Sequence, residues 1–152
     1  MDPGRLRALE TRLGHRFADA SRLARALTHA SHAHEHPPEP DQEALAFVGD
    51  AALGLIVAER LFEESPAAPV GVLTPARAEL VSGANLARWG SALELGALVR
   101  LGRGEELSGG RERESILATT LEAIVGAVYL EAGLDGVRRM VAGLAGWSAR
   151  SA

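Results

Sequence analysis

Apolar residues recur along the chain at the three- and four-residue spacing of helices, and no segment alternates between apolar and polar residues as a half-buried strand does. Prolines, glycines and capping residues divide this pattern into separate segments. The pattern therefore predicts an all-α fold. The predicted helices span residues 3–13, 19–31, 42–63, 74–81, 84–94, 114–132 and 135–147, with a polar, proline-rich loop at 32–41 and a glycine-rich, charged loop at 103–113.

Two of the predicted helices are apolar on nearly every side. In residues 44–58 the one ionisable residue is Asp50, and in residues 115–130 the one acid is Glu122. A helix that is hydrophobic all round is usually buried, and a buried carboxylate is costly unless it is paired, hydrogen-bonded or bound to a metal. The pattern therefore predicts a helical bundle built around two buried helices, each of which carries an acid that needs a partner.

Helical periodicity places each acid on a stripe of small or polar residues. The stripes are Glu43, Ala46, Asp50 and Gly54 in the first helix, and Ser115, Thr119, Glu122 and Gly126 in the second. If the stripes face each other, the two carboxylates form a minimal oxygen site for Mg²⁺. Water molecules and substrate phosphates would complete the coordination shell of the ion. Such a site suits phosphodiester hydrolysis. In the alternative, structural interpretation the acids bond to arginine, to backbone amides or to each other.

Composition narrows the class of protein. The 152 residues, 47% hydrophobic and 24% charged, have the length and make-up of one globular domain, so we expect a single domain over residues 1–152. The absence of cysteine excludes thiol catalysis, disulfides and cysteine zinc sites. The N-terminus is polar rather than a basic-then-apolar leader, and both long apolar runs carry a central acid. We therefore expect a cytoplasmic protein with no membrane partner.

The charge of the chain gives a mixed indication about nucleic acids. A net charge of −4 at pH 7 argues against RNA binding through a general positive field, although it leaves room for a local basic face. Arg111 and Arg113 in the glycine-rich loop are candidates for holding an RNA phosphate, with Asn85 a weaker candidate, while a merely solvated loop is the alternative. The four histidines from His29 to His36 either bind zinc or nickel or are solvated.

Five segments of the chain, in order, resemble the ribonuclease III family. Residues 42–54, QEALAFVGDAALG, are similar to the family signature, usually Asn-Glu-Arg-Leu-Glu-Phe-Leu-Gly-Asp. Residues 108–133, SGGRERESILATTLEAIVGAVYLEAG, resemble the second family block, usually Ser-Ile-Leu-Ala-Asp-Thr-Phe-Glu-Ala-Leu-Ile-Gly-Ala. LARALTHASHAHEH, ARAELVSGANLA and ELGALVRLGRGEELSGG resemble further family segments. The resemblance covers nearly the whole chain and implies the helical nuclease fold of that family.

The resemblance also implies roles for particular acids. The family's nuclease domain uses four acids around Mg²⁺, and Asp50 and Glu122 fall on two of those positions, whereas Ala46 and Thr119 occupy the other two. Glu43 matches a signature glutamate outside the four, so Glu43 and Thr119 are expected at most to support the site. The compact branch called Mini-ribonuclease III resembles this chain at the altered positions and is a nuclease of structured RNA. Asp50 and Glu122 are therefore the expected catalytic and metal-binding pair.

Partners follow from the same resemblance. Family members dimerise through the signature helix and bind an RNA duplex by its shape, backbone and 2′-hydroxyls. We expect a homodimer, double-stranded or structured RNA, and Mg²⁺ with Mn²⁺ as a possible substitute. The sequence stops at Ala152 without the double-stranded-RNA-binding domain of typical bacterial relatives. We therefore expect RNA to be bound by this domain itself, by its dimer partner, by a helper protein or by the ribosome.

Two functions remain open at this point. The first is a Mg²⁺-dependent endoribonuclease in RNA processing, which the presence of Asp50 and Glu122 favours. The second is a catalytically inactive family member that serves as an RNA-binding or ribosome-associated scaffold. Ala46, Thr119 and the net acidity of the chain favour this second function.

Overall fold

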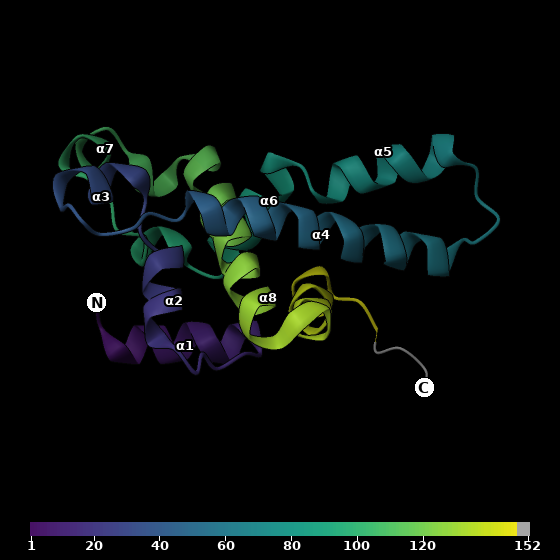
Figure 1. The fold of residues 1–152 in the computed structure, drawn as a ribbon. Coiled ribbons are helices and arrows are strands. Elements are labelled where there is room, and N and C mark those ends of the chain that lie inside the picture. The colour runs from purple at the N-terminus through teal and green to yellow at the C-terminus, as the bar shows by residue number, and fades with distance from the viewer. Residues whose placement is uncertain (149–152) are drawn as a thin grey trace.

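The computed structural model describes residues 1–148, and within them it contains helices but no β-strand (Figure 1). The all-α prediction is therefore confirmed. The α-helices are α1 (Pro3–Leu13), α2 (Ala20–Ala26), α3 (Ala30–Glu35), α4 (Glu43–Glu64), α5 (Val70–Leu80), α6 (Gly83–Ala92), α7 (Arg103–Leu107) and α8 (Glu114–Ala145). Two 3₁₀ helices, Leu95–Ala97 and Gly110–Glu112, flank α7.

Helix α1 agrees with the prediction at both ends. The Asp2 carboxylate accepts a hydrogen bond of 2.9 Å from the backbone N–H of Gly4, and Pro3 occupies the first helical position. Gly14 ends the helix in the left-handed conformation, with φ of 67°. A capping carboxylate and a terminal glycine are local signals, which is why the sequence was sufficient here.

The predicted helix over residues 19–31 is wrong, because the chain forms two short helices there. Between α2 and α3, Leu27 and His29 bond to the distant backbone of Arg100 instead of continuing a helix. The carbonyl of Leu27 accepts from the N–H of Arg100 at 2.7 Å, and the N–H of His29 donates to the carbonyl of Arg100 at 3.0 Å. Helix α3 then takes up the first part of the predicted proline-rich loop.

Two further boundaries differ from the prediction. Helix α5 begins at Val70 rather than at Thr74, so Pro75 lies inside it. No residue of α5 is buried, and Figure 1 shows it returning alongside the outer half of α4 as an exposed hairpin. The predicted loop at 103–113 instead contains α7 and a 3₁₀ helix, because ion pairs within it, Glu106 with Arg111 and Glu105 with Arg113, hold the segment in a compact form.

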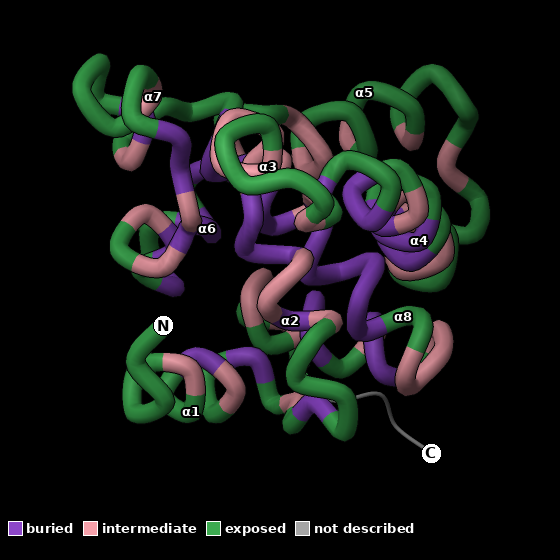
Figure 2. Tube along the Cα trace, turned by 60° about the vertical axis from the view of Figure 1, so that its left-hand side comes forward, coloured by how far each residue is buried: buried purple, intermediate pink, exposed green. Residues whose placement is uncertain are grey.

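Helix α8 forms the centre of the molecule. Its first part is buried, and Leu121, Ile124 and Val128 have no exposed surface; Figure 2 shows buried tube through the middle and exposed tube over most of α5 and α7. The predicted break at Gly133 is confirmed, since this residue leaves helical geometry with φ of 64° and ψ of −164°. Helix α8 is long and apolar enough to cross a membrane, but 61% of its most apolar window is buried inside the protein, as in a core helix.

Candidate active site

Helices α4 and α8 cross with their backbones in direct contact at two glycines. A Cβ atom on Gly49 would lie 1.7 Å from the carbonyl oxygen of Glu122, and a Cβ atom on Gly126 would lie 2.0 Å from the carbonyl oxygen of Leu45. Both distances are far below van der Waals contact, so no larger residue fits at either position. This crossing brings the two acid-bearing stripes of the sequence to face each other.

The crossing places Asp50, which follows Gly49, beside Glu122. The prediction that Asp50 is buried is wrong, because its side chain is exposed. Helix α4 buries one face, which includes Leu45, Gly49 and Leu53, and leaves the face of Asp50 open. Glu122 is partly buried. The pair therefore lies at the surface of the α4–α8 crossing, where a solvent-borne ligand can reach it.

The electrostatics of this pair are unusual. Burial of Glu122, the negative charge of Asp50, and a hydrogen bond between the two carboxyl groups together raise the pKa of Glu122 to about 7. Loss of hydration disfavours the charged form, and a neighbouring like charge does the same. Near neutral pH the pair therefore exchanges a proton readily, and a bound cation would relieve the repulsion between the two ionised groups.

The side chains present can supply part of the coordination shell of a hard divalent cation, but not a complete shell made of protein ligands. Within residues 1–148 there is no group of three or more histidine or acidic side chains that could hold a metal ion. Mg²⁺ commonly needs only one or two carboxylates when water and phosphate oxygens supply the rest of its shell. Asp50 and Glu122 match that requirement.

Zinc or nickel binding was one of two alternatives for the histidine segment, and the described residues contain no group of three or more side chains that could hold such an ion. The His32 and His36 rings stack with their centroids 4.1 Å apart, and His32 also lies 2.8 Å from an Arg100 nitrogen. The Nδ1 of His29 accepts from the N–H of Ser31 and thereby caps α3. These side chains hold α3 in place rather than converging on one point.

Ala46 and Thr119, which stand where the family usually has acids, and the nearby Glu43 differ in how far they are buried. Ala46 is buried, with 8% of its surface exposed. Thr119 is partly buried one turn before Glu122, and Glu43 is exposed in the first turn of α4, about two turns from Asp50. Glu43 and Asp50 are therefore roughly 10 Å apart along the helix axis, and a supporting role for Glu43 and Thr119 stays a prediction.

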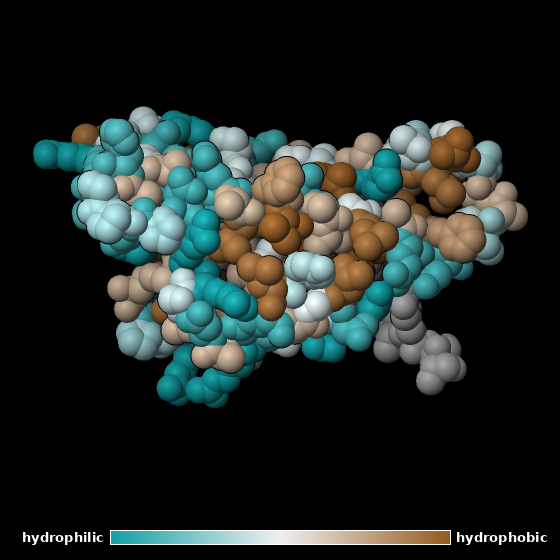
Figure 3. Space-filling view, in the orientation of Figure 1, coloured by the Kyte–Doolittle hydropathy of each residue, from teal (hydrophilic) through white to brown (hydrophobic). Residues whose placement is uncertain are grey.

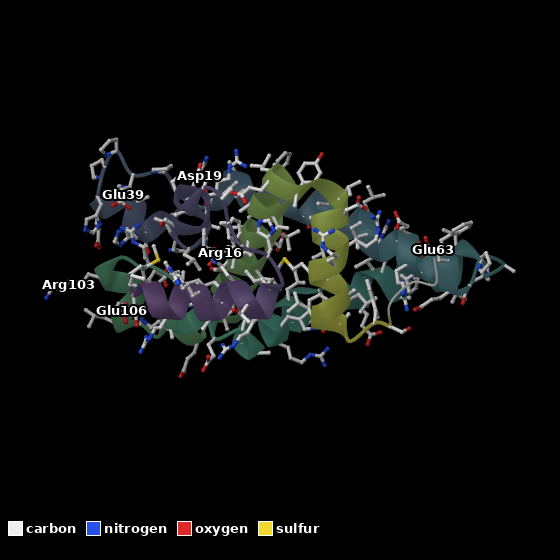
Figure 4. The ribbon with its side chains drawn as sticks, turned by 90° about the horizontal axis from the view of Figure 1, so that it is seen from below. Arg16, Asp19, Glu39, Glu63, Arg103 and Glu106 are labelled. Atoms are coloured by element: carbon white, nitrogen blue, oxygen red, sulfur yellow. The ribbon has the colours of Figure 1, made fainter. Side chains whose placement is uncertain are left out.

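The predicted RNA-contacting side chains already have partners within the chain. Arg111 forms two hydrogen bonds of 2.6 Å with the Glu106 carboxylate and donates to the backbone carbonyls of residues 96 and 99. Arg113 pairs with Glu105, and the Asn85 amide donates to the carbonyl of residue 80 at 2.7 Å. In Figure 4 Glu106 lies near the edge of the molecule from which Arg103 extends outward. RNA contact by Arg111, Arg113 and Asn85 stays a prediction.

An apolar surface lies on the same side of α4 as Asp50. Phe47 is 81% exposed and Leu55 is 51% exposed, and Tyr129 and Leu130 of α8 are also exposed. Figure 3 shows hydrophobic atoms gathered over α4 and α8 on the face drawn. Contiguous exposed apolar surface of this kind marks sites of protein association. From the sequence, the apolar residues 47–56 could be either a dimer surface or intramolecular core, because a helix that is apolar all round does not reveal which face the fold leaves uncovered.

Gln42 was missed at the sequence level. It has no exposed surface, and its side-chain amide donates to the carbonyl of Ala26 and to the hydroxyl of Thr120. The available signal was an amide at the predicted start of the helix, one residue before the apolar run of residues 44–58 and about two turns ahead of Asp50.

Fold and site together define a class: an all-helical domain whose two central helices cross at paired glycines and present two neighbouring carboxylates. A family model described as Ribonuclease-III-like matches residues 19–144. Ribonuclease 3 of Streptomyces coelicolor is 50% identical over 133 residues, which are 88% of this chain and 48% of that protein. Ribonuclease 3 of Heliobacterium modesticaldum is 46% identical over 140 residues, 91% of this chain and 60% of that protein.

A solved structure gives the same result. The crystal structure of the nuclease domain of ribonuclease III from Campylobacter jejuni is 37% identical, with a TM-score of 0.86, over 95% of this chain and 94% of that chain. A second structure of that domain is described as showing flexibility in a region involved in dimer formation. The chain therefore belongs to the ribonuclease III-like family. It spans about half the length of the two ribonucleases 3, 48% and 60%.

Proposed function

We propose that this chain is the nuclease domain of a homodimeric endoribonuclease that cleaves double-stranded or structured RNA, with Mg²⁺ as its metal and Mn²⁺ as a substitute. The juxtaposition of Asp50 and Glu122 carries this proposal. The crossing of α4 and α8 supports it, because a Glu122 carboxyl that is partly buried and hydrogen-bonded to Asp50 has its pKa raised to about 7. A carboxyl group whose pKa is shifted by burial together with a specific charged neighbour is common at functional sites.

Asp50 and Glu122 would hold the cation through their carboxylate oxygens once Glu122 has lost its proton. A divalent cation bound there supplies a nucleophilic water of lowered pKa and stabilises the charge that develops on the scissile phosphate. The chain's own contribution is to fix the two carboxylates at the helix crossing and to keep one of them, Asp50, open to the incoming backbone.

The homodimer is supported by the apolar surface around Phe47. This surface adjoins Asp50 on α4, so a second copy packed there would set two active sites on either side of one interface. Such an isologous contact gives the twofold symmetry that suits the two strands of a duplex.

The alternative function is a catalytically inactive scaffold that binds RNA or the ribosome. The specific observation in its favour is the site's small ligand set: Ala46 offers no oxygen from its side chain, and Thr119 offers a hydroxyl in place of a carboxylate. Two carboxylates hold a metal more weakly than four, so this alternative predicts a folded protein that binds RNA without cutting it.

Cleavage of a long RNA duplex separates the two functions. Wild type in Mg²⁺ or Mn²⁺ is expected to shorten the duplex, while Asp50→Asn and Glu122→Gln each lose at least about 100-fold in rate. Glu114→Gln, an exposed glutamate two turns before Glu122 on the same helix, is the matched control and keeps the wild-type rate. An inert wild type that still binds the duplex would favour the scaffold.

A further inference from the structure

Gln42 is a fully buried amide that ties three elements together. Its side-chain nitrogen donates to the carbonyl of Ala26, at the end of α2, at 2.7 Å, and to the hydroxyl of Thr120, in α8, at 3.2 Å. Gln42 has no exposed surface, and Thr120 is 1% exposed. Buried hydrogen bonds of this kind are directional and costly to break, so they fix the groups that they join.

The backbone of Gln42 takes part in the same arrangement. Its N–H donates to the carbonyl of Thr28 at 2.9 Å, and its carbonyl accepts from the N–H of Ala46 at 2.9 Å. The second of these bonds starts the hydrogen-bond ladder of α4. The first turn of α4 is therefore anchored by both the backbone and the side chain of one residue.

This anchor lies near Glu122 along α8 and at the start of α4, the helix that carries Asp50. Thr120 precedes Glu122 by two residues, and Asp50 follows Gln42 by about two turns. The contact between Gly49 and Gly126 sets how closely the helices approach, and apolar side chains of both helices pack around it, but none of these contacts is directional. The hydrogen bond from Gln42 to Thr120 is directional, so it fixes the position of α4 along α8 and its rotation against α8.

We propose that Gln42, acting through Thr120, is a positioning residue that holds α4 and α8 in the register at which Asp50 and Glu122 bind one metal ion together. This inference rests on the proposed nuclease function. Gln42 touches neither RNA nor metal; it acts on the geometry of the residues that do. Groups that hydrogen-bond directly to metal ligands typically contribute 10- to 100-fold to metal affinity or activity, and because Gln42 and Thr120 act one step further from the ligands we expect the lower end, about 10-fold.

Two substitutions of Thr120 separate positioning from packing. Thr120→Val keeps the shape and removes the hydroxyl, whereas Thr120→Ser keeps the hydroxyl and removes a methyl group. The variants are compared by Mn²⁺ affinity in calorimetry without RNA, at a temperature where each is folded. Positioning predicts about a 10-fold loss of affinity for Thr120→Val and less than a twofold change for Thr120→Ser.

Gln42→Met tests the other end of the bond, because methionine has a similar length and no hydrogen-bonding amide. It is expected to lose about 10-fold in Mn²⁺ affinity, and the double variant with Thr120→Val loses no more than either single one, since both break the same bond. At saturating Mn²⁺ the kcat for duplex cleavage falls while KM for RNA stays at its wild-type value. If Gln42→Met does not fold, the Thr120 pair alone decides.

Val141→Ala is the matched control for lost stability. Val141 is fully buried in α8 beyond the break at Gly133, away from the two acids. This variant should unfold more easily and bind Mn²⁺ as wild type does. Wild-type affinity in Thr120→Val and Gln42→Met, with only their stability reduced, would overturn the positioning role and leave the nuclease proposal standing. A wild type that neither binds Mn²⁺ nor cuts RNA would overturn both.

Discussion

At the scale of single residues, the site depends on two carboxyl groups so close that Asp50 helps to raise the pKa of Glu122. The pKa of Glu122 is about 7 in the folded chain, against an ordinary value of 4.5. A carboxyl group whose pKa is raised by folding destabilises the fold once the pH exceeds its unfolded value, because the unfolded chain ionises more easily. The destabilisation grows from about pH 4.5 to about pH 7 and is constant above that.

Glu122→Gln should therefore stabilise the metal-free protein at pH 8. Allowing for the partial exposure of the side chain, the expected gain in unfolding free energy is on the order of 1–2 kcal/mol at pH 8, and it vanishes at pH 4. Urea denaturation at the two pH values measures it. The control Glu114→Gln, with an exposed side chain, should show no such gain. An equal effect of Glu122→Gln at both pH values would refute the assigned pKa.

At the scale of elements, the crossing of α4 and α8 is the feature that makes the site. Gly49→Ala would drive a methyl group into the Glu122 carbonyl, with 1.7 Å between the atoms before any relaxation. We expect this variant to lose more than about 3 kcal/mol of unfolding free energy or to fail to fold.

Gly54→Ala is the matched comparison in the same helix, because a Cβ there meets no atom within 4 Å. It should gain roughly 0.5–1 kcal/mol through better helix propensity. Urea denaturation of both variants gives the contrast. Similar stability of Gly49→Ala and Gly54→Ala would mean that the two helices do not cross at Gly49.

The elements also show what the sequence could and could not predict. Local signals sufficed for α1, for the length of α4 and for the break at Gly133. They failed where backbone distant in the sequence competes for hydrogen bonds. The backbone of Arg100 bonds to Leu27 and His29, and the helix expected there is broken. The facing of the two acid stripes was a conditional prediction, because Gly49 and Gly126 become informative only when one knows that their helices cross. The exposure of Asp50 was mispredicted for a related reason, since apolar residues on the open face of α4 look like core in a single chain.

At the scale of the whole molecule, that open face predicts association. Phe47→Arg places a charge in the centre of the apolar surface and should convert a dimer to a monomer in sedimentation analysis. Leu107→Arg is the matched control, because Leu107 is 80% exposed on α7, in a different part of the fold, against 81% for Phe47. A Phe47→Arg protein that sediments as wild type does would exclude this face as the dimer contact.

Mn²⁺ titration by calorimetry at pH 8, where Glu122 is ionised, shows whether Asp50 and Glu122 act as one metal site. Wild type is expected to bind one ion per chain. Asp50→Asn and Glu122→Gln should each weaken that binding by at least about 10-fold, while Glu114→Gln leaves it unchanged. Wild-type Mn²⁺ affinity in both Asp50→Asn and Glu122→Gln would contradict the shared site.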